Sequence, residues 1–420
     1  MKHGVHLFPV QLLAGLLACG YAVAQDSTTD LRGNVSADWT GFWEDAKFPN
    51  QHDSYLSLAG EPELIHERNS GDDIFTFKPF YRVDQHDNKR THGDIRELSW
   101  IHAERDWELT AGFSKVFWGV TEAVHLVDII NQTDFVENTD GEDKLGQPMV
   151  NLALIRDWGV VDLFVLPYFR ERTFRGKNGR PRFGIPVDNN DVKYENSSEE
   201  KHVDFAVRWS HTLGDWDVGI AHFAGTTREP RFVFLPKNIN PVKMLPKTTN
   251  QLYEQIHQTS IDVQATIGSW LWKLEAFTRS GQGDRFTAAA GGFEYTYVGV
   301  HDTAIDIGVI SEYLHDGRDD EFDTSTVKLK EPFSASIFEE DVVLGLRFTF
   351  NDVQSTELLA STIIDIEGDG VNYNIEASRR LGDSWKLSME VRGVFFVDEG
   401  TTLSSFEDDD RVQFELTRYF

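Results

Sequence analysis

Residues 202–210 read HVDFAVRWS, and apolar and polar side chains alternate along this stretch. Every second residue is apolar: Val203, Phe205, Val207 and Trp209. The polar residues Asp204 and Arg208 lie between them and project to the opposite side of an extended chain. A period of two residues predicts a β-strand with one apolar and one hydrated face.

The same alternation recurs along the chain, for example over 260–267, 342–350 and 371–378. The alternating runs are long, whereas strands of soluble sheets usually have about 5–6 residues. A tilted strand that crosses a membrane needs about 9–11 residues. Long strands with a continuous polar face favour a transmembrane β-barrel with a hydrated interior over a soluble sandwich.

We predict an all-β fold, a transmembrane antiparallel up-and-down barrel of about 18 strands. An even number brings both ends of the barrel wall to the same side of the membrane. Pro62 weakens the second predicted strand, and without the first two strands the count becomes 16. The predicted strands span 31–43, 54–67, 73–85, 93–104, 106–118, 149–157, 159–170, 202–213, 215–225, 257–268, 270–280, 286–299, 302–314, 338–351, 355–366, 370–381, 384–397 and 410–420.

Short and long connections alternate between these strands. Short turns are predicted near Arg105, Asp157, Gly214, Gly268 and Gly382. The long polar connections span about 119–148, 170–201, 226–256 and 315–337. Short periplasmic turns and longer outer loops are typical of outer-membrane barrels.

The N-terminus predicts export. Lys2 precedes a short apolar stretch from Leu12 to Ala18, and Ala22-Val23-Ala24 forms a small-residue cleavage site. Residues 1–24 are therefore predicted to be a signal peptide, and 25–420 a single barrel domain in the outer membrane. Cys19 is the only cysteine, and it is either removed with the signal or acylated as in lipoproteins.

The amino-acid composition limits the kinds of partner that the protein can bind. The chain has 40 Lys and Arg against 69 Asp and Glu, a formal net charge of −29. This acidity argues against nucleic acid as a partner, since phosphate binding requires a basic face. Expected partners are outer-membrane lipids and lipopolysaccharide, the barrel-assembly machinery and a small hydrophilic solute.

The last strand resembles the assembly signal of bacterial outer-membrane barrels. Phe414, Leu416 and the terminal Phe420 alternate along one face, and Tyr419 is next to last. The resemblance implies that Phe414, Leu416 and Phe420 act as the assembly signal. It also makes a homotrimer one expectation, because porins are often trimers.

A second resemblance, to porin-like barrels including the alginate-export type, lies at 112–119, GFSKVFWG, which is followed by Asp128-Ile129-Ile130-Asn131. In those families the following loop often folds into the lumen. The apolar residues of 120–148 are also unusual for a solvated loop. We expect an infolded segment near 119–148 that either narrows the pore, presenting Asp128, Asn131 and Asp134 to solute, or packs as a plug.

Several charged clusters are candidates for function. Inward positions of both signs could set a transverse field across a constriction or form wall pairs, with Arg82, Arg208, Arg347 and Arg380 as constriction candidates. The acidic run 134–143 does not match Ca²⁺-loop spacing and is expected to be a solvated loop, so no metal or other cofactor is predicted. A basic cluster could contact anions or lipopolysaccharide phosphates, although internal pairing with Glu171 and 188–200 is preferred. Its members are Arg170, Arg172, Arg175, Lys177, Arg180 and Arg182.

The sequence predicts a porin-like channel for passive diffusion of small hydrophilic solutes. Alternatives are a conduit that exports an anionic polymer, or a non-transport barrel such as an adhesin or a phospholipase-like enzyme. The chain lacks the Gly-x-Ser-x-Gly and His-Glu-x-x-His motifs, which disfavours an enzyme, and no catalytic residues are predicted.

Overall fold

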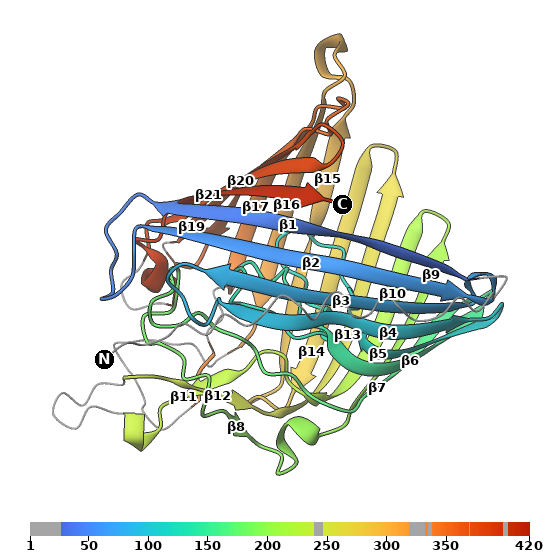
Figure 1. Ribbon diagram of the computed structural model, residues 1–420, viewed down its shortest axis with the longest axis horizontal. Helices are drawn as coiled ribbons and strands as arrows, with labels where there is room; N and C mark the ends of the chain where they lie inside the picture. Colours follow the sequence, from blue (N-terminus) through green and yellow to red (C-terminus); the bar gives the residue numbers. More distant parts are fainter. Residues whose placement is uncertain (1–26, 239–246, 319–331, 335–337, 369, 398–401) are drawn as a thin grey trace, which may run out of the picture.

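A computed structural model describes residues 27–238, 247–318, 332–334, 338–368, 370–397 and 402–420. Its main body is a barrel of 18 antiparallel strands (Figure 1). The first strand, β1 (Thr28–Phe42), pairs with the last, β21 (Arg411–Tyr419), and this pairing closes the wall. Two backbone hydrogen bonds between Gly33 and Phe420, of 3.0 and 3.1 Å, extend the closing seam. The predicted signal peptide and Cys19 lie outside the described residues.

Each of the eighteen predicted strands is confirmed, and each pairs with its neighbours in sequence. The first two predicted strands are in the wall, so the alternative of 16 strands is wrong. The remaining wall strands are β2 (Ser54–Arg68), β3 (Asp73–Asp84), β4 (His92–Ala103), β5 (Trp107–Ser114), β6 (Gln147–Arg156), β7 (Gly159–Leu166), β9 (Asp204–Leu213), β10 (Trp216–Thr226), β13 (Gln255–Ile267), β14 (Trp270–Ser280), β15 (Phe286–Tyr297), β16 (Asp306–Asp316), β17 (Glu340–Thr349), β18 (Glu357–Asp365), β19 (Val371–Leu381) and β20 (Trp385–Phe395).

Two predicted strands extend too far at their C-terminal ends, and the strand predicted over 302–314 begins too early, since β16 begins at Asp306. The strand predicted over 106–118 ends at Ser114, and the one predicted over 159–170 ends at Leu166. In the first of these, the alternation continues past the strand end. Trp118 is buried in the lumen and the partly buried Val116 packs beside it, but both belong to the infolded segment and not to the wall. Periodicity alone cannot separate the two environments.

Pro62 lies in the middle of β2, opposite Gly33 of β1. On the other side of β2 the ladder with β3 has no pairs at 61–63, and it resumes at Leu64 and Phe77. The missing N–H of the proline therefore falls at an interruption of the ladder, where a strand tolerates proline.

All long connections leave the barrel at one end, and turns such as 157–158, 214–215 and 268–269 close the other end. At the long-loop end, β8 (Lys193–Tyr194), β11 (Arg231–Val233) and β12 (Asn250–Tyr253) form a small separate sheet (Figure 1). Other connections contain short 3-10 turns such as Asn69–Gly71 and Leu403–Phe406. Among the described residues, no helix is long and apolar enough to cross a membrane.

The outer surface of the wall is apolar. Phe205, Ile220 and Leu344 are each about half exposed on it, at 53%, 45% and 45%. Soluble proteins rarely expose continuous apolar surface on this scale, whereas a lipid-facing barrel wall requires it. Exposed tryptophans, among them Trp216 and Trp270, begin strands beside the short turns, as an interfacial aromatic girdle would.

The two faces of β21 are expected to respond differently to charge. Leu416 faces outwards near the middle of the strand, so Leu416→Arg should destabilise the barrel by about 2–4 kcal/mol in a bilayer. Gln413 faces inwards beside Asp38, at 2.6 Å, so Gln413→Arg should be tolerated. Urea unfolding in lipid vesicles measures both changes, and equal losses would contradict the assigned register.

Candidate functional site

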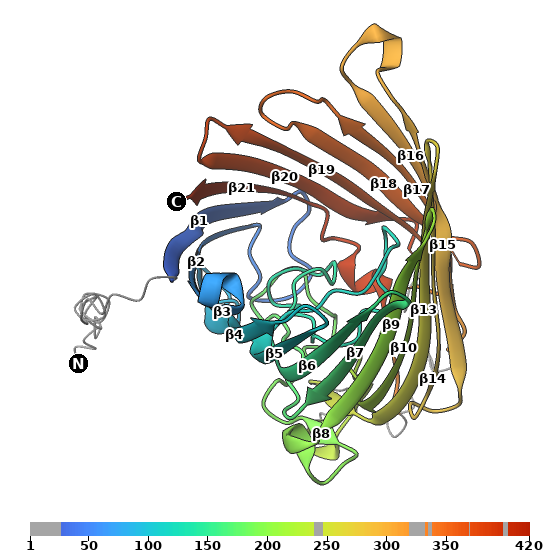
Figure 2. The ribbon, with the colours of Figure 1, turned by 90° about the vertical axis from the view of Figure 1, so that its right-hand side faces the viewer.

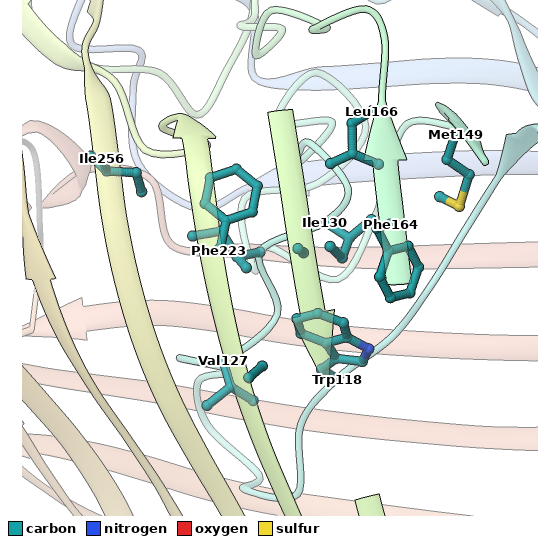
Figure 3. Packing of buried hydrophobic residues seen from close by; sticks show 11 residues of the cluster. Trp118, Val127, Ile130, Met149, Phe164, Leu166, Phe223 and Ile256 are labelled. Atoms are coloured by element: carbon teal, nitrogen blue, oxygen red, sulfur yellow. The ribbon is translucent and has the colours of Figure 1, made fainter. Parts of the chain in front are cut away.

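The segment between β5 and β6, residues 115–146, runs inside the barrel (Figure 2). Four of its apolar residues are buried against inward-facing side chains of the wall (Figure 3): Trp118, Val127, Ile129 and Ile130. The wall residues of this cluster are Met149, Phe164, Leu166, Ala206, Ala221, Phe223 and Ile256. Burial of this apolar surface explains how a segment without regular structure is retained in the lumen.

Two wall carboxylates hold the tip of this segment. Glu275 of β14 is fully buried and accepts hydrogen bonds from the backbone N–H groups of Val120 (2.6 Å), Thr121 (3.0 Å) and Val127 (3.1 Å). Glu312 of β16 accepts two more, from residues 122 and 123, at 2.8 and 3.1 Å. These carboxylates satisfy backbone donors that would otherwise be buried without partners.

The side chain of Glu122 bridges two cations of the wall, Lys273 on β14 and Arg347 on β17. It contacts Lys273 at 3.1 Å and forms an ion pair with Arg347. Arg347 also lies 3.4 Å from Glu294. The constriction candidate Arg347 therefore lies at a contact between the infolded segment and the wall.

Asn131 joins the two ends of the segment. Its Oδ1 accepts from the N–H of Val116 at 2.8 Å, and its Nδ2 donates to the carbonyls of Ser114 and Leu145, both at 2.9 Å. All of these bonds are internal, so the geometry gives this constriction candidate a role in shaping the segment.

The two aspartates predicted to face solute are also paired. Asp128 lies 3.1 Å from Lys144 Nζ, and burial raises the pKa of the Asp128 carboxyl although Lys144 opposes the shift. Asp134 is fully buried and lies 2.8 Å from Arg96 Nη1 of β4.

The acidic run 134–143 is not the solvated loop that we expected. Asp134 and Glu137 are buried, and Glu137 forms an ion pair with Arg82 at 2.8 Å. Arg82 also donates to Ser57 at 2.7 Å. The expectation was wrong for these two acids because Arg82 and Arg96 lie at inward positions directly opposite them. Within the described ranges, no group of three or more His, Cys, Asp or Glu is placed to hold a metal ion.

The other two constriction candidates differ in their positions. Arg208 forms two contacts with Asp262 on the inner wall, of 2.5 and 2.8 Å, and its guanidinium lies over the Trp118 ring. Arg380 is exposed near the short-turn end of β19. The structure therefore brings Arg82, Arg208 and Arg347 to the infolded segment but not Arg380.

The basic cluster 170–182 is largely held by internal contacts. Arg170 lies 2.6 Å from Asp94, and the fully buried Arg180 lies 2.6 Å from Asp409. These partners come from β4 and from the connection before β21. We had predicted pairing with Glu171 and residues 188–200 instead. In the structure Glu171 accepts a hydrogen bond from Tyr194, at 2.6 Å.

The other members of the cluster form hydrogen bonds mainly with backbone carbonyls or face solvent, and Arg172 also donates to the side chain of Gln132 at 3.1 Å. Arg172 donates to the carbonyl of residue 228 at 2.7 Å, Arg175 to that of residue 137 at 3.0 Å, and Arg182 to that of residue 183 at 2.7 Å. Lys177 is exposed. Lys177 is therefore the member of this cluster that is accessible for direct contact with lipopolysaccharide.

A cavity of about 780 Å³ lies between the infolded segment, the long loops and the inner wall. Its lining includes nine Lys and Arg against eight Asp and Glu, whereas the whole chain has 40 against 69. Asp128 and Asn131 contribute to this lining, as do Arg172, Arg175 and Arg182 of the basic cluster. The lining of this cavity is thus much less acidic than the chain as a whole.

Sequence reasoning did not identify Glu275, Glu312 or Glu122 as anchors of the infolded segment. The sequence of β15 does contain a signal for where the infolded segment packs. Its small residues Ala288, Ala290 and Gly292 occupy successive inward positions. Small inward residues leave space for another segment, and Leu126 packs against this part of the wall.

Comparison with known proteins supports the architecture. No family model matches the sequence, and no curated protein matches it. The solved structure of OccD3 (OpdP) from Pseudomonas aeruginosa is similar over 93% of this chain and 90% of that chain, with a TM-score of 0.52 and 9% identity. A mutant of the Rh. blastica porin has a TM-score of 0.44 and 11% identity over 94% and 100% of the two chains. The similarity to OccD3 shows a shared barrel fold.

Proposed function

We propose that this chain is a porin-like channel of the outer membrane that lets small solutes diffuse passively across it. The observation that carries the proposal is the 780 Å³ cavity inside a closed, lipid-compatible barrel, bounded by an infolded segment. A pore of this design is tuned by the residues that line its narrowest part. A hydrophilic solute is the general expectation for such a channel.

The geometry indicates that the infolded segment obstructs only part of the lumen. Trp118, Val127, Ile129 and Ile130 cover the wall formed by β6, β7, β9, β10 and β13, whereas the cavity adjoins inward residues of β16 to β19. The apolar cluster of the infolded segment therefore lies on one side of the lumen, whereas the tip and Asp140 of the same segment reach the other side. Solute would pass through the cavity beside these contacts.

Single-channel recording in a planar bilayer tests the proposal. The purified, signal-cleaved protein should give discrete and stable current steps in KCl, and a salt gradient would then give its ion selectivity. A folded, heat-modifiable barrel that gives no steps would contradict the proposal. Migration without heating would also show whether the channel is a homotrimer.

A second candidate is a conduit for an anionic polymer, which the arginines of the cavity favour. Addition of a short oligouronate to one side of the bilayer separates the two functions. A polymer conduit should show long current blocks, whereas a channel restricted to small solutes should show none.

A further inference from the structure

Part of the cavity lining is a continuous apolar surface. Inward positions of three consecutive strands are aliphatic where they line it, with Leu314 on β16, Val343 on β17 and Ile363 on β18. Val343 and Ile363 are direct partners across their ladder, so their side chains form one continuous surface. Val124 of the infolded segment packs against this wall and also lines the cavity. A fully hydrated solute gains nothing from such a surface, whereas an apolar one does.

Aromatic rings from separate connections extend the apolar lining towards the long-loop end. Phe135 stacks on Phe174 with ring centroids 5.9 Å apart and an interplanar angle of 4°. Phe174 also contacts Phe232 at 5.8 Å, and Phe183 contacts Phe406 at 5.7 Å. All five rings line the cavity. Rings arranged in this way offer flat faces and edges to a ring or chain of a solute.

Three arginines of the cavity lining each have a guanidinium nitrogen that forms no hydrogen bond within the described part of the chain. Within the described part of the chain, Arg175 Nε, Arg182 Nε and Arg228 Nη2 are buried atoms without a hydrogen-bond partner. Arg228 is only 4% exposed, and its other nitrogens bind Asp204 and backbone carbonyls. A buried N–H without a partner is unfavourable, and an anionic oxygen would satisfy it with a charge-assisted bond.

We infer that the cavity binds a small amphipathic carboxylate, with its apolar body on the aliphatic and aromatic lining and its carboxylate at Arg175, Arg182 and Arg228. A volume of about 780 Å³ falls within the usual range of ligand pockets, about 300–1,000 Å³. The near balance of charge in the lining removes the repulsion that the acidic chain would otherwise exert on an anion. The inference rests on the proposed channel function and names its class of solute.

Three probes separate the parts of this inference. 4-Phenylbutyrate carries both an apolar body and a carboxylate, acetate carries the carboxylate without the body, and 4-phenylbutan-1-ol carries the body without the charge. Calorimetric titration of the detergent-purified protein and interruptions of single-channel current report their binding. We expect 4-phenylbutyrate to bind at least about tenfold more tightly than either of the other two.

Two variants and a control assign the site. Arg182→Gln removes a guanidinium whose protein hydrogen bonds go to backbone carbonyls, so it should fold and weaken 4-phenylbutyrate about tenfold. Leu359→Gln adds an amide to the inner wall and should weaken the same probe while leaving acetate unchanged. Arg285→Gln is the control, because Arg285 is exposed and lies outside the cavity lining.

Each possible result of these experiments tests a different part of the inference. Equal affinity for acetate and 4-phenylbutyrate would overturn the apolar part, and equal affinity for the alcohol would overturn the anionic part. Binding that no lining variant changes would overturn the site. If KCl steps occur without preferential binding, the channel stands and the inference fails. If binding occurs without steps, the site stands and the proposed channel fails.

Discussion

The Glu275→Ala variant is expected to give larger and noisier single-channel currents than the native protein. Glu275 accepts hydrogen bonds from three backbone N–H groups at the tip of the infolded segment and from the hydroxyl of Thr121 at 2.7 Å. Hydrogen bonds to a charged group contribute about 1.5–3 kcal/mol each, and their effects are not additive. A net loss of about 3 kcal/mol would raise the population of the released tip roughly a hundredfold.

Two comparisons isolate the anchoring role. Glu275→Gln keeps one acceptor oxygen and should give an intermediate current. Glu376→Ala removes a charge from an inward position of β19 that lines the cavity but touches no backbone of the tip, so it should leave current noise unchanged. Equal currents for Glu275→Ala and the native channel would show that the apolar packing alone holds the tip.

A deletion of residues 123–140 should also enlarge the pore, but its effect would be harder to assign. The deletion removes Asp134 and Glu137 together with the tip, and it leaves Arg96 and Arg82 of the wall without these partners. A change in conductance could then come from a distorted wall. The single substitution at Glu275 avoids this problem because the acidic run keeps its contacts.

The barrel wall could be predicted from sequence because it obeys one local rule. Alternation with period two marks each wall strand independently of its neighbours, and short turns such as 214–215 fix where one strand ends and the next begins. Even the weak strand around Pro62 was found, since the alternation on both sides of the proline is strong.

The interior could be predicted only in outline. The apolar residues of 120–130 indicated that this segment is not solvated, but they do not specify which wall strands receive it. Its anchors, Glu275 and Glu312, are distant in sequence from the tip they hold. A carboxylate at an inward position has the same sequence pattern whether it faces water, a cation or a backbone N–H. Only the three-dimensional path of the segment separates these cases.

The Asp134→Ala variant is expected to lose about 3–5 kcal/mol of unfolding free energy, because it leaves a buried cation without its main partner. Arg96 is 3% exposed and lies 2.8 Å from Asp134. Asp134 also accepts a hydrogen bond from Thr173, which ties the infolded segment to the next long connection. Asp143→Ala, in the same acidic run but exposed, should cause no loss. Urea unfolding followed by tryptophan fluorescence measures both variants.

The difference in unfolding free energy between the native protein and Asp134→Ala should decrease as the pH is lowered. Burial opposes ionisation of Asp134, but His92, whose Nε2 lies 3.6 Å from the carboxylate, and the charge of Arg96 outweigh it and hold the pKa of Asp134 well below its ordinary value of 3.8. A carboxyl with a lowered folded-state pKa contributes its full stability above the unfolded-state value. The contribution falls as the pH decreases below about 3.8 towards the lower folded-state pKa. The stability curves of the two proteins should therefore converge in acid, and a constant difference from pH 7 to pH 2 would mean that packing rather than charge pairing makes Asp134 necessary.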